Sequence, residues 1–83
     1  MTDKLDLVLV HINHKRQTLT RWLAVSFNDL ILLSGFDIRP DKLYEISYTM
    51  QGVKFETVVD SSNGHVTLWP EHGMEFTVTE LNR

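Results

Sequence analysis

Short runs in which apolar and polar residues alternate dominate this sequence, and each run ends at a cluster of turn-forming residues. This pattern restricts the chain to a fold built mainly from strands. Six runs are predicted as strands, at residues 5–12, 18–25, 43–50, 53–59, 65–69 and 74–81. Polar residues join the first run to the second, and Gln51-Gly52 joins the third to the fourth, so the sequence predicts two hairpins.

One segment departs from the alternation and predicts a helix. Ser26 is followed three positions later by Asp29, a spacing typical of a helix start, because the hydroxyl caps a free backbone amide and the carboxylate lies at the positive end of the helix. Gly35 suits the left-handed position that ends a helix. The predicted class is therefore α+β: a β-grasp with a mixed sheet of four to five strands and one short helix on one face. A small open barrel of the OB type is the alternative layout.

Length and charge narrow the function. The 83 residues allow one domain, residues 1–83, with a very short C-terminal tail at 81–83. Eleven acidic and eight basic side chains give a formal charge of −3, which disfavours nucleic acid as a partner. The chain has no cysteine, no signal-peptide pattern and no apolar run near the ~18 residues of a membrane span. We expect a cytoplasmic protein that does not bind membranes.

The sequence predicts no enzyme and no cofactor. Its acidic residues are dispersed, and it lacks both the Gly-x-Ser-x-Gly elbow and a glycine-rich phosphate loop. A core this small leaves little room for a deep catalytic pocket. His11, His14, His65 and His72 fall on different predicted strands and turns without the spacing of metal ligands. They are predicted to be ordinary surface or turn histidines, with no metal.

The first hairpin carries the strongest functional pattern. If Val8 and Val10 face the helix, alternation turns Leu7 and Leu9 to the opposite face, and the same count on the second strand turns Trp22 there too. Exposed apolar patches of this kind usually mark a partner surface. The alternative is that a bent sheet or a loop covers these residues.

Several segments, taken in their order along the chain, match the pattern of a known family. Ile12-Asn13 ends the first strand, an apolar run ends at Ser34-Gly35, and Pro40 precedes Tyr44-x-Ile46-x-Tyr48. The most specific segment is Gly73-Met74-x-Phe76-x-Val78-x-Glu80. With these features the chain resembles the bacterial ubiquitin-like proteins of the multiubiquitin type, over nearly its whole length.

The resemblance implies a protein modifier in a bacterial ubiquitination-like pathway. An activating enzyme would adenylate its C-terminal carboxylate, and a conjugating enzyme would transfer it to a target. A JAB-type peptidase would be encoded nearby. Such a modifier is the substrate and has no catalytic residue, so the resemblance implies that Leu81, Asn82 and Arg83 form the conjugation tail.

Two departures from the eukaryotic pattern stand out. The chain has no terminal Gly-Gly, and the outward residues of the later strands are polar, including Glu45, Ser47 and Thr77. The predicted partner surface is therefore Leu7, Leu9 and Trp22 of the first hairpin. A non-covalent interaction or regulatory module of the phage or toxin–antitoxin type is the alternative function, and an OB-like nucleic-acid-binding domain is the third.

Overall fold

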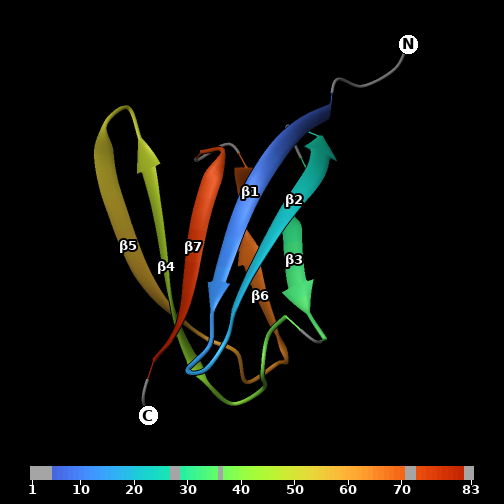
Figure 1. Cartoon of the computed structure of the whole chain (residues 1–83), viewed down its shortest axis with the longest axis vertical. Helices are drawn as coiled ribbons and strands as arrows, with labels where there is room; N and C mark the ends of the chain where they lie inside the picture. The colour runs from blue at the N-terminus through green and yellow to red at the C-terminus, as the bar shows by residue number, and fades with distance from the viewer. Residues whose placement is uncertain (1–4, 27–28, 36, 71–72, 82–83) are drawn as a thin grey trace.

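Seven strands in two sheets make up the computed structural model, which describes residues 5–26, 29–35, 37–70 and 73–81 (Figure 1). The strands are β1 (Leu5–Asn13), β2 (Thr18–Ser26), β3 (Ile31–Ser34), β4 (Leu43–Met50), β5 (Val53–Asp60), β6 (His65–Leu68) and β7 (Glu75–Leu81). Five of them form a mixed sheet in the order β2-β1-β7-β4-β5, and β3 pairs with β6 in a second sheet. The parallel pair β1–β7 lies in the middle of the larger sheet.

The six predicted strands and both hairpins are confirmed, with ends that differ by a residue or so. Gln51 and Gly52 both have positive φ, 53° and 81°, as a two-residue hairpin turn requires. The turn cluster after β5 also forms, since Asp60 Oδ1 accepts a hydrogen bond of 2.8 Å from Ser62 N.

The predicted helix is wrong, and with it the α+β class and the helix-bearing β-grasp. Ile31–Ser34 form β3, and the described residues contain no α-helix. Asp29 N donates to Ser26 O at 3.0 Å. Gly35 has the predicted left-handed φ of 65°, but it ends a strand. Part of the predicted helix, residues 27–28, lies outside the described residues.

The cause of the error is the apolar run that precedes Gly35, because a short continuous apolar segment satisfies both the helical and the strand period. Pairing with β6 makes the segment a strand. Ile31 lies across from Leu68 and Leu33 across from Val66, and all four side chains are buried. Leu32, between them, is 56% exposed. Buried and exposed side chains therefore alternate along this segment, as they do in a strand.

One hydrophobic core lies between the two sheets, and β3 and β6 lie behind the larger sheet in Figure 1. Its buried residues are Val8, Val10, Ile12, Ile31, Leu33, Ile38, Tyr44, Ile46, Val66, Leu68, Phe76 and Val78. Burying each of the larger aliphatic or aromatic side chains contributes about 1.5–3 kcal/mol, so this layer is the main source of stability. None of the residues that the structure describes belongs to a helix that could cross a membrane.

Candidate functional site

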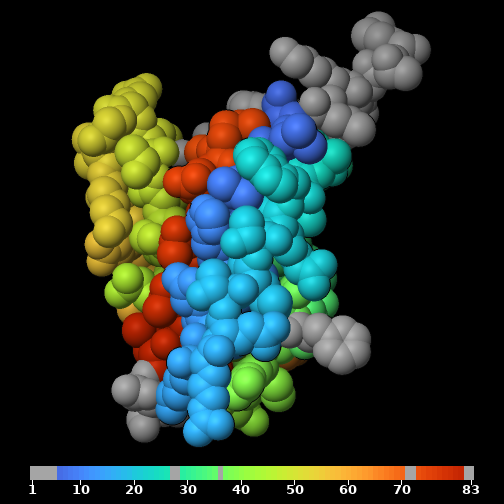
Figure 2. Space-filling model, in the orientation of Figure 1, coloured from blue at the N-terminus to red at the C-terminus, as the bar shows by residue number. Residues whose placement is uncertain are grey.

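The predicted partner residues lie together on the face of the larger sheet that β3 and β6 do not cover. The β1–β2 register places Leu9 directly across from Trp22, with Leu7 two positions along the same face. Leu7 is 58% exposed, Trp22 is 64% exposed and Leu9 is half-buried. Figure 2 views this face, with β1 in blue and β2 in cyan at its front. We call Leu7, Leu9 and Trp22 the open-face patch.

Polar side chains border the open-face patch toward β7. His11 Nδ1 lies 3.3 Å from Thr20 Oγ1, and His11 Nε2 lies 3.6 Å from Glu75 Oε2. Thr77 pairs with His11 on the same face. The surface thus has an apolar centre and a polar, solvent-exposed border, which is the usual anatomy of a protein-binding surface.

Of the predicted conjugation tail, the structure describes Leu81. Leu81 is the last residue of β7, is half-buried and pairs with Leu43 of β4. Asn82 and Arg83 lie outside the described residues. Leu9 is aligned with Glu75 at the start of β7, so Leu81 lies six positions, or about 20 Å, further along the sheet. Leu81 and the open-face patch are therefore far apart on the sheet.

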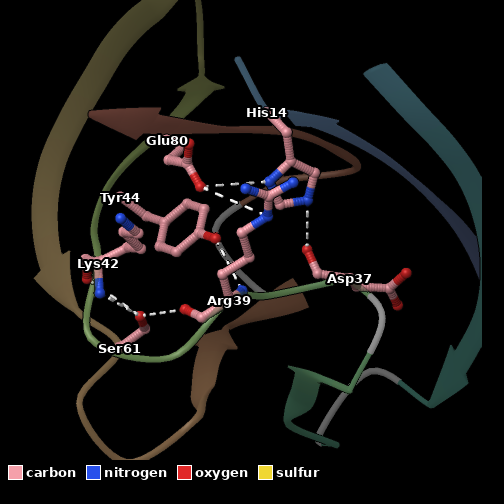
Figure 3. Close-up of polar contacts among 7 residues, drawn as sticks. All are labelled: His14, Asp37, Arg39, Lys42, Tyr44, Ser61 and Glu80. Carbon is pink, nitrogen blue, oxygen red and sulfur yellow. Dashed lines mark hydrogen bonds and ion pairs between the residues drawn. The ribbon is translucent and has the colours of Figure 1, made fainter. Parts of the chain in front are cut away.

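A buried polar cluster, which the sequence analysis did not predict, lies where β1 and β7 end (Figure 3). His14 follows β1, and its side chain is 5% exposed; Glu80 lies on β7, and its side chain is 1% exposed. His14 Nδ1 is 3.6 Å from Glu80 Oε1, an ion-pair distance that is too long for a hydrogen bond. His14 lies in the β1–β2 turn, as predicted, but its side chain points into the core rather than to the surface.

The connector between β3 and β4 is held by this cluster. His14 Nε2 bonds to Asp37 O at 2.9 Å, and Arg39 N donates to Tyr44 Oη at 2.9 Å. Ser61 Oγ, fully buried, donates to Arg39 O at 2.7 Å and accepts from Lys42 N at 3.1 Å (Figure 3). These bonds give partly buried backbone groups of an irregular segment the partners that they need.

The surroundings of Tyr44 in this cluster raise the pKa of its hydroxyl. Burial raises the pKa of its hydroxyl above the ordinary value of 10.0, and the Glu80 carboxylate raises it further. The hydrogen bond from Arg39 N and the Arg39 guanidinium lower the pKa and offset part of this rise. The phenol therefore stays neutral at physiological pH and serves as a hydrogen-bond acceptor.

Local sequence patterns could not predict this cluster, because its residues come together only in the folded chain. Glu80 is 66 positions from His14, and the two meet because β1 and β7 run side by side in parallel. The alternation of β7 did indicate that Glu80 is buried. Phe76 and Val78 face the core, and Glu80, two positions further along, lies on the same face. An acidic residue on an inward position requires a polar partner.

Two hollows, one of about 790 Å³ beside the β4–β5 turn and one of about 180 Å³ between β5 and β6, are lined by residues outside this cluster. Within the described residues, no group of three or more His, Cys, Asp or Glu side chains could hold a metal ion. We interpret the cluster as a structural network that anchors the connector.

The other histidines lie in different places. His11 is on the open face, and His65 is on β6 across from Ser34. His72 lies outside the described residues. The structure does not bring the three described histidines together as a set.

Comparisons with known proteins leave the chain without a relative to guide the assignment. No family model matches it, no curated protein matches it, and no solved structure matches it. The functional assignment therefore depends on the geometry of the chain itself.

Proposed function

We propose that this chain is a non-catalytic protein-binding domain whose contact surface is the open-face patch. The observation that carries the proposal is the pairing of Leu9 with Trp22, beside Leu7, on a sheet face where Leu7 and Trp22 are more than half exposed. Tryptophan is among the residues most enriched at the energetic centre of protein interfaces. A rigid sheet presents it at a low cost in conformational entropy.

Two further features support a protein as the partner. The face carries the imidazole of His11 and the carboxylate of Glu75 at its border, which suits directional polar contacts around an apolar centre. The formal charge of −3 argues against a phosphate backbone as the ligand. The proposal includes a cytoplasmic location, which the absence of cysteine from the sequence supports.

The ubiquitin-like modifier stays a prediction and becomes the second candidate. It drew on a helix-bearing fold, which is wrong, and on a free tail at residues 81–83, of which Leu81 pairs with Leu43 of β4. A mixed five-stranded sheet is present, as expected for that class. The modifier would need the activating and conjugating enzymes and the JAB-type peptidase that the resemblance implies.

Matched surface variants test the binding proposal. The tagged chain is expressed in its organism of origin as wild type, as Leu7→Ser/Trp22→Ser and as Leu32→Ser, and co-purifying proteins are quantified by mass spectrometry. Leu32 is 56% exposed on the opposite layer, so it controls for the loss of an exposed leucine. We expect a specific partner to be lost from the double variant and kept by Leu32→Ser. Equal recovery of every partner from all three proteins would contradict the proposal.

The modifier candidate is tested separately. The chain is incubated with ATP and an activating enzyme encoded beside its gene, and its intact mass is measured with and without residues 81–83. An adduct that requires the tail would establish the modifier function. An unchanged mass, together with partner loss in Leu7→Ser/Trp22→Ser, would favour the binding domain.

A further inference from the structure

Strand β5 forms an exposed edge of the larger sheet, opposite to the edge formed by β2. Its eight residues pair with β4 without a bulge, and the strand has neither proline nor glycine. Val53 and Val58 are each 56% exposed and Phe55 is 38% exposed. Natural edge strands are usually protected by bulges, prolines, covering segments or charged side chains, and β5 has charged residues but no bulge or proline. An edge this regular, with its charges of both signs, is a template for a strand of complementary charge.

The hairpin geometry defines which backbone groups face outward. A two-residue turn is closed by a hydrogen-bonded pair, here Met50 and Val53, and hydrogen-bonded pairs then alternate with non-bonded pairs along the hairpin. Lys54, Glu56 and Val58 are therefore in non-bonded pairs with β4. Their N–H and C=O groups point away from β4, toward the edge.

We propose that two copies of this chain associate through antiparallel pairing of their β5 edges, centred on Thr57, to form one continuous ten-stranded sheet. In this register Glu56 of each copy lies across from Val58 of the other, and the outward backbone groups of both residues pair. Thr57 lies across from its own counterpart on the two-fold axis. The interface is self-complementary, as a two-fold dimer requires.

Charge selects this register among those that the hydrogen-bond pattern allows. Centring the pair on Glu56 would place two carboxylates directly opposite each other, which destabilises a sheet. Centring it on Phe55 would shorten the overlap, because the turn at Gln51-Gly52 ends the strand there. Centring on Thr57 pairs residues 54–60 and places the Lys54 ammonium across from the carboxylate of Asp60, which also accepts a hydrogen bond from Ser62 N.

Shape supports the same register. Phe55 of one copy lies across from Val59 of the other, and Val59 lines the hollow of about 180 Å³ beside β6. The hollow is mostly apolar, with Leu68 and Trp69 on its other side. Phe55 is held on this face by stacking on Tyr48, with ring centroids 5.4 Å apart and 16° between the planes. Each copy thus offers an exposed ring and, next to it, an apolar hollow for the partner's ring.

A cysteine scan tests the proposal directly, because the chain contains no cysteine. Thr57 lies in the non-bonded pair on the axis, where Cα atoms approach about 4.5 Å and a disulfide forms with little strain. Lys54→Cys is the matched control, since its counterpart would lie six positions, or about 20 Å, away. We expect Thr57→Cys to give about tenfold more disulfide-linked dimer than Lys54→Cys under mild oxidation, measured by non-reducing electrophoresis.

A second variant tests the association without a crosslink. Proline at Glu56 removes an outward N–H and leaves the ladder with β4 intact. We expect the wild type to sediment as a concentration-dependent dimer and Glu56→Pro, with an unchanged far-UV spectrum, to sediment as a monomer. A monomeric wild type at all concentrations would overturn the proposal. Crosslinking of Phe55→Cys or Glu56→Cys in preference to Thr57→Cys would overturn it as well. Because β5 and the open-face patch are at different parts of the sheet, neither result affects the proposed function.

Discussion

His14 and Glu80 come from the two ends of the sequence, and their side chains meet in the core with Nδ1 3.6 Å from Oε1. The contact joins the end of β1 to the end of β7, and Arg39 of the connector approaches the same oxygen at 4.0 Å. Both members of the pair are almost fully buried, whereas the Arg39 side chain is 62% exposed. The pair therefore ties the end of β1 to the end of β7, and the bond from His14 Nε2 to Asp37 O ties His14 to the connector.

Removing His14 is expected to destabilise the fold strongly. His14→Ala leaves the Glu80 carboxylate buried and without its nearest partner, at a cost of about 3 kcal/mol in the free energy of unfolding. Arg39→Ala should cost less than about 1 kcal/mol, because an exposed pair at that distance is screened by solvent. Urea unfolding measures both, and a double-mutant cycle with Glu80→Ala measures the coupling. Equal costs for His14→Ala and Arg39→Ala would contradict the role of the pair.

Alkaline pH is expected to weaken the fold through Tyr44. Its folded pKa is raised above 10.0, so the folded state holds the phenolic proton more tightly than the unfolded state does. The resulting stability is fully present below pH 10 and is lost as the pH rises through the folded pKa. Tyr44→Phe should be less stable at neutral pH, because Arg39 N loses its acceptor, but should lose less stability above pH 10. Unfolding free energies of both proteins from pH 8 to 11 test this, and parallel curves would contradict it.

Two neighbouring leucines distinguish the strand β3 from the predicted helix. Leu33 is 3% exposed and Leu32 is 56% exposed. Leu33→Ala should therefore cost about 2–4 kcal/mol of unfolding free energy, and Leu32→Ala less than about 1 kcal/mol. Chemical denaturation measures the difference. Similar costs at both positions would contradict the alternation on which β3 is based.

Ser61 is expected to be the most important hydroxyl in the chain's turns. Ser61→Ala removes the acceptor of Lys42 N and the donor to Arg39 O at a site with no exposed surface. We expect a loss of about 1–3 kcal/mol and faster hydrogen exchange at the Lys42 amide. Ser62→Ala is the control, because Ser62 is exposed and bonds through its backbone N–H. Unchanged exchange at Lys42 would contradict this role.

Local patterns were enough to predict most of the strands and the side chains that lie on the open face. The period of two in the first hairpin placed Leu7, Leu9 and Trp22 on one face, and the β1–β2 register places them there. The pattern failed at Ile31–Ser34, where a continuous apolar run is compatible with two periods and a distant strand, β6, decides the outcome. It also failed for His14 and Glu80, since the parallel pairing of β1 with β7 leaves no local mark in the sequence.

Photo-crosslinking at the open-face patch tests the central functional claim most directly. A photoreactive phenylalanine analogue is placed at position 22 in one protein and at position 32 in another, because both native side chains are more than half exposed. After irradiation in the organism of origin, adducts are identified by mass. We predict a discrete protein adduct from position 22 that Leu7→Ser abolishes, and none from position 32. Equal adducts from both positions, or an adduct at position 22 that Leu7→Ser leaves unchanged, would contradict the account.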